Sequence, residues 1–167
     1  MPRIYLPADT AMLRTLAETG ELEPAGPVHM VTRALREAHP DADVEDLEYT
    51  AFDDAAVASL ALLGDSRASS GRLLAGQAPR RVVVSADMPD DRLTEHADGT
   101  AADCDGTVRL KKVAAVHVDD ADAAAELAAV LDSPQTPDLA SIEAHVLDWY
   151  APSELQDLLA GLGSRKP

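Results

Sequence analysis

Cysteine and large aromatic side chains are scarce in this chain of 167 residues. Its one cysteine, Cys104, excludes an intramolecular disulfide and a cysteine-based metal cage. Aromatic residues make up 3% of the sequence although hydrophobic residues make up 46%. The composition therefore predicts a core built mainly from Leu, Val and Ala, in which the few large rings occupy structurally decisive positions.

Long apolar runs and dense basic clusters are also missing. No apolar run approaches the length of about 18 residues that a membrane-spanning helix needs, and the first residues lack the apolar region of a signal peptide. We therefore expect a cytoplasmic protein with no membrane segment. The formal net charge is −16, and a surface this acidic repels phosphate backbones, so nucleic-acid binding is not expected. The simpler interpretation of this acidic composition is solubility. The more specific alternative is that the acidic surface binds a basic partner protein or cations.

Short β-branched runs alternate with segments of helical spacing. Strands are predicted at residues 3–7, 80–86, within 107–118 and at 143–150. Helices are predicted at 9–20, 29–39, 43–64, 120–131 and from 153 onwards, with loops at 21–27 and 88–106. This order predicts a single α+β domain over residues 1–167, with one mixed sheet of four to five strands and about five helices, mostly on one face.

Several residues mark the ends of these elements. Pro7 should end the first strand, because proline cannot donate to a ladder. Asp9 and Asp43 are predicted N-caps, and Gly20 and Gly64 should end the helices that follow them. The last helix should begin with a capping box formed by residues 153–156 (Ser-Glu-Leu-Gln).

Alternation along the predicted strands separates a dry face of the sheet from a mixed one. The mixed face should carry Tyr5, Ser85 and His117, together with one set of residues from the last strand. Trp149 and Tyr150 are adjacent, so one ring should enter the core. The other is then free to form a surface for a protein partner.

The stretch 112–126 reads as a strand that passes directly into a helix, with a histidine in the strand and aspartates at the joint. His117, Asp119 and Asp120 are candidates for a divalent metal, although two ligands do not make a site. The competing interpretation is an N-cap beside a satisfied strand histidine. Carboxylates at this joint argue against an anionic ligand. Asp87, after an earlier strand, is a further candidate for Mg²⁺, against the more usual solvated loop.

Three stretches together resemble an uncharacterised family of short actinobacterial proteins. They are residues 3–8 (Arg-Ile-Tyr-Leu-Pro-Ala), 113–120 (Val-Ala-Ala-Val-His-Val-Asp-Asp) and 149–155 (Trp-Tyr-Ala-Pro-Ser-Glu-Leu). The resemblance spans nearly the whole chain and implies a cytoplasmic protein of a high-GC bacterium. The family has no established activity, so the resemblance assigns no catalytic residue.

The sequence contains no Gly-rich phosphate loop, serine elbow or two-histidine metal motif. It therefore favours a non-enzymatic binding or regulatory protein that needs no cofactor and meets a protein partner through its surface. The alternative is a small divalent-metal-dependent hydrolase that uses His117, Asp119 and Asp87, which a pocket joining the three would favour. A homo-oligomeric structural protein is a third hypothesis. The oligomeric state and the question of catalysis stay open at this point.

Overall fold

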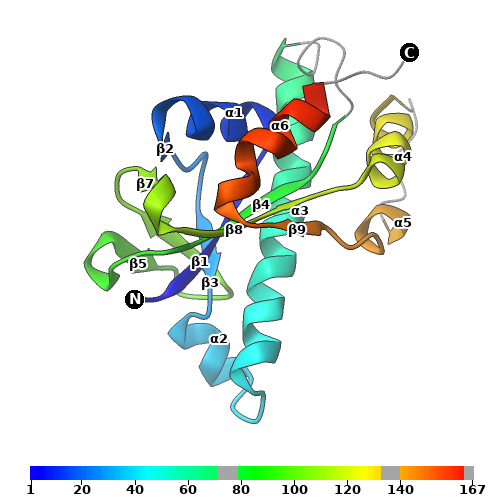
Figure 1. Ribbon diagram of the computed structural model, residues 1–167. Helices are drawn as coiled ribbons and strands as arrows, with labels where there is room; N and C mark the ends of the chain where they lie inside the picture. The colour runs from blue at the N-terminus through cyan, green and yellow to red at the C-terminus, as the bar shows by residue number, and fades with distance from the viewer. Residues whose placement is uncertain (71–78, 133–139, 164–167) are drawn as a thin grey trace.

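A seven-stranded antiparallel sheet runs through the computed structural model, which describes residues 1–70, 79–132 and 140–163 (Figure 1). The strand order is β5-β6-β3-β1-β4-β8-β9, and β2 pairs with β7 in a separate ribbon. The strands are β1 (Arg3–Ala8), β2 (Glu21–Leu22), β3 (Val28–Met30), β4 (Val82–Asp87), β5 (Leu93–Glu95), β6 (Ala101–Cys104), β7 (Val108–Arg109), β8 (Val113–Val118) and β9 (Asp148–Tyr150).

Helices cover both faces of the large sheet. They are α1 (Thr10–Thr19), α2 (Arg33–Ala38), α3 (Val44–Ser70), α4 (Ala121–Asp132), α5 (Ala140–Glu143) and α6 (Leu155–Gly163). The long α3 packs on β1, β3 and β4 from one side, while α1 and α6 lie against each other on the other side (Figure 1). Within the described ranges, no helix is long and apolar enough to cross a membrane.

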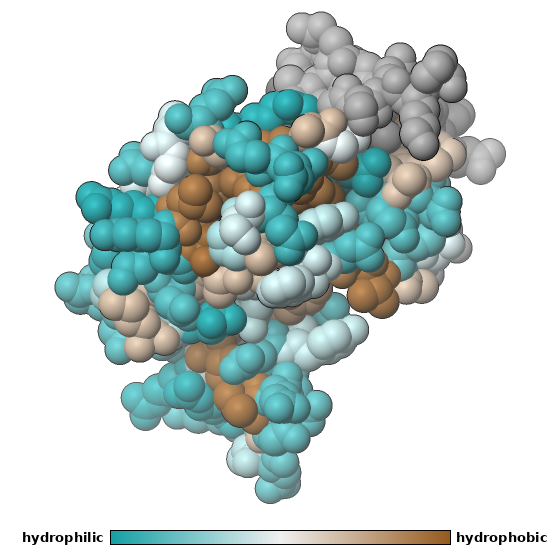
Figure 2. All heavy atoms as spheres, in the orientation of Figure 1, coloured by the Kyte–Doolittle hydropathy of each residue, from teal (hydrophilic) through white to brown (hydrophobic). Residues whose placement is uncertain are grey.

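The dry face of the sheet holds the main core. Alternate residues of the three central strands, such as Ile4, Val84 and Val116, are fully buried there against α1 and α6. Burying one such side chain contributes roughly 1.5–3 kcal/mol relative to leaving it exposed. Figure 2 views the molecule from this side: hydrophilic residues cover most of it, and apolar residues are visible around α1, β2 and α6. The predicted alternation is therefore confirmed in β1, β4 and the second half of β8, whereas Val113 enters the main core instead of the mixed face because a β-bulge shifts the register there.

The helix caps were also predictable. The Asp9 carboxylate accepts a hydrogen bond from the Met12 amide at 2.8 Å, and Asp43 accepts one from the Asp46 amide at 2.9 Å. Gly20 follows α1 with φ 76°, a left-handed conformation that side chains with a Cβ avoid. The predicted beginnings of α1 and α3 and the predicted end of α1 are confirmed.

The sheet is larger than the predicted four to five strands, it is antiparallel rather than mixed, and helices are not confined mostly to one face. The difference arises because the predicted loop 88–106 contains the whole antiparallel β5–β6 hairpin, while the predicted loop 21–27 contributes β2 to the separate ribbon. These strands are two to four residues long, too short for an alternating pattern to be recognised. The predicted helix 29–39 is confirmed only for α2, because its first residues belong to β3 and the helix begins after the N-cap Thr32.

Four further boundaries differ from the predictions. Pro7 lies inside β1, beyond the point where β3 pairs with β1, so its missing N–H leaves no partner on β3 unsatisfied. Gly64 lies within α3. The predicted strand 143–150 is reduced to β9, preceded by α5. At the last helix no Ser153 cap forms: the Glu154 carboxylate accepts from the Ala151 amide at 3.3 Å, and a 3-10 turn (Pro152–Glu154) leads into α6.

Candidate functional site

A groove of about 300 Å³ opens on the mixed face of the sheet, where α3 crosses the strands near β8 and β9. We call it the aromatic groove because four rings besides His117 contribute to its walls. The side chains that line it come from β1, α3, β4, β8 and β9: Arg3, Tyr5, Glu45, Glu48, Tyr49, Phe52, Ser85, Ala115, His117 and Trp149. The predicted placement of Tyr5, Ser85 and His117 on one face is confirmed by the strand register and by this shared groove.

Ser85 and His117 form the floor of the aromatic groove. His117 pairs with Val83, the neighbour two residues before Ser85, so the two side chains lie diagonally across β4 and β8. The Ser85 Oγ and His117 Nε2 atoms are 2.9 Å apart. Burial, with a smaller contribution from the Arg3 charge, lowers the pKa of His117 to about 4. The floor is therefore uncharged at neutral pH.

Aromatic rings form the walls of the groove around this floor. The Phe52 ring meets His117 edge-on with centroids 4.7 Å apart, and it meets Tyr5 edge-on at 5.9 Å. Further out, Tyr49 and Trp149 are 65% and 61% exposed. Such exposure is unusual for two of the chain's few large rings, and large apolar side chains left open to solvent around one hollow are typical of binding surfaces.

The polar rim of the groove carries net negative charge. Glu45 is exposed and Glu48 half-buried, and the Tyr5 hydroxyl donates to the Glu48 carboxylate at 3.5 Å. Burial raises the pKa of Tyr5, and the Glu48 charge adds to this effect. Arg3 is the groove's cation, but it pairs with Asp87 at 2.8 Å. Neither rim glutamate forms an ion pair within the described residues, although the Arg3 charge also interacts with Glu48 at longer range.

Asp87 does not join His117. It ends β4 opposite Arg3, whereas His117 precedes Val118, which pairs with Val82 at the other end of β4. The 3-10 turn that follows (Asp90–Arg92) carries Asp90 and Asp91. The strand register alone therefore separates two of the three side chains that the hydrolase hypothesis needs.

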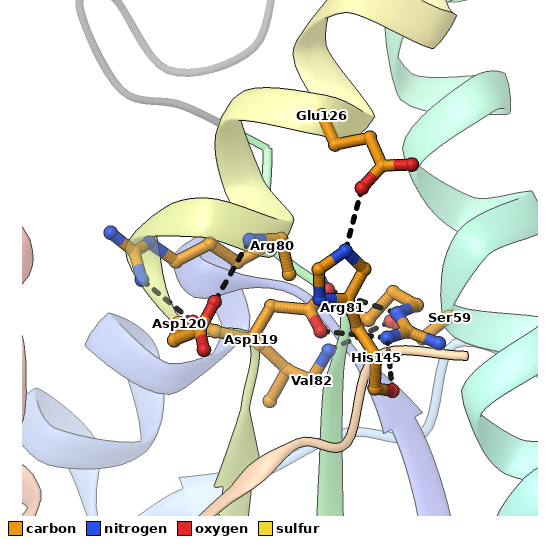
Figure 3. Close-up of polar contacts among 9 residues, drawn as sticks. Ser59, Arg80, Arg81, Val82, Asp119, Asp120, Glu126 and His145 are labelled. Atoms are coloured by element: carbon orange, nitrogen blue, oxygen red, sulfur yellow. Dashed lines mark hydrogen bonds and ion pairs between the residues drawn. The ribbon is translucent and has the colours of Figure 1, made fainter. Parts of the chain in front are cut away.

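Asp119 forms a buried ion pair with Arg81 (Figure 3). Its carboxylate accepts from Arg81 Nε at 2.9 Å, from Nη2 at 2.8 Å and from the Arg81 amide at 2.9 Å. The side chains of Arg81 and Asp119 are 4% and 0% exposed. Arg81 also donates to the His145 carbonyl at 2.9 Å, which ties the start of β4 to the segment before β9.

Asp120 acts as the N-cap of α4: its carboxylate accepts from the Ala123 amide at 2.8 Å. The competing interpretation of this joint, a helix cap, is thus the one that the structure supports. No group of three or more His, Cys, Asp or Glu side chains in the described part of the chain is placed to hold a metal ion. The described residues therefore do not bring His117, Asp119 and Asp87 together as ligands of one metal ion.

Trp149 and Tyr150 divide as predicted between the two faces of the sheet. Trp149 lies opposite His117 and lines the aromatic groove, whereas Tyr150 lies opposite Val116 and packs half-buried against the main core. Because adjacent strand residues point to opposite faces, Trp149 is left as the more exposed of the two rings.

The sequence predictions missed the contribution of α3 to the groove. Glu45, Glu48, Tyr49 and Phe52 recur at spacings of three and four residues, which places them on one side of the helix. That spacing was visible in the sequence. What was not visible is that this side of the helix would rest beside His117.

Comparison with known proteins yields one family. The model of a family described as a family of unknown function (DUF6912) matches residues 2–159. No curated protein and no solved structure matches the chain. The expected likeness to an uncharacterised family is thereby supported.

Proposed function

The chain belongs to DUF6912, a family of unknown function, and we propose that it is a binding protein whose aromatic groove receives a lysine or arginine side chain from a basic segment of a partner protein. The observation that carries the proposal is the juxtaposition of two exposed rings, Tyr49 and Trp149, with the carboxylates of Glu45 and Glu48 around one hollow.

Cations bind to aromatic faces because the ring quadrupole is negative there. A cation held against a ring gains roughly 0.5–2 kcal/mol, or about 2- to 30-fold in affinity. The carboxylates of Glu45 and Glu48 add charge complementarity, the Ser85–His117 floor is neutral, and the repulsion from Arg3 is reduced by its ion pair with Asp87. The net charge of −16 attracts a basic partner over longer range and speeds association at low salt.

Binding accounts for this site better than catalysis does. Ser85 and His117 are the nucleophile and base types of a hydrolase, but Ser85 is 2% exposed. A histidine with a pKa of about 4 is also a weak base at neutral pH. No hydrogen bond from a described residue orients His117 Nδ1, a contact that a Ser–His pair normally requires.

Trp149 is the one tryptophan of the chain, so its fluorescence reports directly on the groove. We expect titration with a hexa-arginine peptide to change that fluorescence saturably, with an affinity that falls as salt is added. A hexa-glutamate peptide should cause no change. The double variant Glu45→Gln/Glu48→Gln should weaken hexa-arginine binding about 5- to 10-fold, in keeping with the loss of two nearby charges.

The matched control is Glu18→Gln/Glu23→Gln, which removes the same charge from exposed positions outside the groove. It should alter the affinity less than twofold. Equal weakening by the two double variants would mean that the peptide responds only to the overall acidic field, and the proposal would then fail.

A further inference from the structure

A second cavity, of about 430 Å³, lies beside α3 on the same face of the sheet, on the β3 and β6 side of β1. We call it the histidine pocket. Its apolar lining comes from Pro7, Ala25, Pro27, Ala58, Leu62 and Ala101. Two imidazoles, His29 and His96, complete the wall. The volume falls in the range of roughly 300–1,000 Å³ typical of small-molecule sites.

A hydrogen-bonded chain fixes the proton on His29. The Thr100 hydroxyl donates to Asp54 Oδ2 at 2.7 Å, and the same oxygen lies 2.8 Å from His29 Nδ1. Because a hydroxyl has one proton, Thr100 can only accept from the histidine. His29 therefore carries its proton on Nδ1, and Nε2 keeps a lone pair.

His29 stays neutral and its Nε2 atom stays available. Burial is the main cause that lowers the pKa of His29, and it outweighs the opposing charge of Asp54. Among the described residues, no hydrogen bond reaches Nε2. Thr100 itself is 3% exposed, so the group that orients the ring is protected from solvent. A half-buried acceptor in a preset tautomer thus borders an apolar hollow.

His96 lines the histidine pocket but takes no part in the hydrogen bonds that join His29, Thr100 and Asp54. Its Nε2 atom lies 2.9 Å from Asp103 Oδ1, within the hairpin of β5 and β6. The carboxylates of Asp54 and Asp103 near the two imidazoles disfavour an anionic ligand. The apolar lining in turn makes the desolvation of any charged ligand costly.

We propose that the histidine pocket binds a small, uncharged, mainly apolar molecule through one O–H or ring N–H group donated to His29 Nε2. The ligand class follows from the lining: apolar surface provides most of the contact, and a single fixed acceptor provides the specificity. The proposal is independent of the aromatic groove, because none of the groove's lining residues lines this pocket.

Indole and 1-methylindole test the proposal with the full-length protein, because a methyl group replaces the N–H donor in the second probe while the ring system stays the same. We expect indole to bind at least about 10-fold more tightly, in line with the cost of leaving one buried acceptor unpaired. In ¹⁵N-resolved NMR spectra of the histidine rings, indole should shift Nε2 of His29.

Two variants separate the donor contact from simple apolar burial. His29→Phe should bring the two probes to equal affinity. Thr100→Val should weaken indole binding about 3- to 10-fold without changing the affinity for 1-methylindole, since it removes the hydroxyl that fixes the tautomer. The unchanged 1-methylindole affinity reports that the pocket remains folded in that variant.

Three results would overturn the inference. The first is equal affinity of the wild-type protein for the two probes, and the second is binding of neither. The third is an indole-induced shift of the Trp149 ring N–H with His29 unmoved, which would place the probe in the aromatic groove instead.

Discussion

Substitution of Asp119 should reveal whether the joint between β8 and α4 serves the fold. Asp119→Ala removes the three hydrogen bonds that Arg81 makes to the carboxylate and leaves the 4%-exposed guanidinium without its counter-charge. Breaking a buried ion pair from one side costs about 3–5 kcal/mol. The free energy of unfolding of an ordinary domain is about 5–15 kcal/mol, so the variant should lose a large part of its stability.

The assay is urea unfolding followed by circular dichroism, with thermal unfolding beside it. For a chain of this size 1 kcal/mol corresponds to roughly 2–4 °C, so we expect the melting temperature to fall by about 6–20 °C. Asp120→Ala is the matched control. It removes the neighbouring carboxylate, which caps α4 through the Ala123 amide, and should cost only about 1 kcal/mol.

The double variant Arg81→Met/Asp119→Leu tests the electrostatic reasoning itself. Replacing both partners by apolar residues of similar volume removes the unpaired charge, so it should recover more than half of the stability that Asp119→Ala loses. Equal losses for Asp119→Ala and Asp120→Ala, at about 1 kcal/mol each, would refute the argument. They would mean that the pair contributes no more than an ordinary cap.

Three further outcomes follow from the structure. The folded pKa of His117, about 4, lies below its unfolded value of 6.5. The stability that neutral His117 contributes is therefore complete above about pH 6.5 and is lost as the pH falls to 4. In urea titrations over this interval, wild type should lose roughly 1–2 kcal/mol more free energy of unfolding than His117→Gln. Gly20→Ala should cost about 1 kcal/mol in thermal unfolding, because φ is 76° and a Cβ there meets no other atom, so backbone strain alone acts; an unchanged melting temperature would contradict this. Ser59→Ala should cost about 1–3 kcal/mol by the same measurement, because the buried hydroxyl donates to the Ala8 carbonyl and accepts from the Val82 amide, whereas a neutral result would mean that these groups find other partners.

The central strands were predictable because their residues are constrained on both faces. In β4 and in the second half of β8 every second side chain enters the main core, and β-branched residues satisfy that requirement. The same alternation correctly placed Tyr5, Ser85 and His117 on the opposite face. The helix caps at Asp9 and Asp43 were predictable for another reason, since each acts within three residues of itself.

Long-range effects decided the parts that sequence patterns missed. The strands β5 and β6 are held by each other and by β3, and their three and four residues have too few side chains to show a period. Gly64 was expected to end α3 because glycine costs about 1 kcal/mol in a helix. The helix nevertheless runs on to Ser70, and the turn before Gly64 is held by Leu60 and Leu63, which are buried with Leu127 and Ile142 of α4 and α5.

The position of α3 has a consequence for both proposed sites. Its residues from Glu45 to Phe52 border the aromatic groove, and those from Ala58 to Leu62 border the histidine pocket. The first part presents carboxylates and rings and the second presents methyl groups, so one helix gives two neighbouring cavities opposite chemical preferences. The aromatic groove suits a cation that keeps part of its hydration at an open rim. The histidine pocket suits an uncharged molecule that surrenders its hydration, and for this reason a single ligand class is not expected to satisfy both.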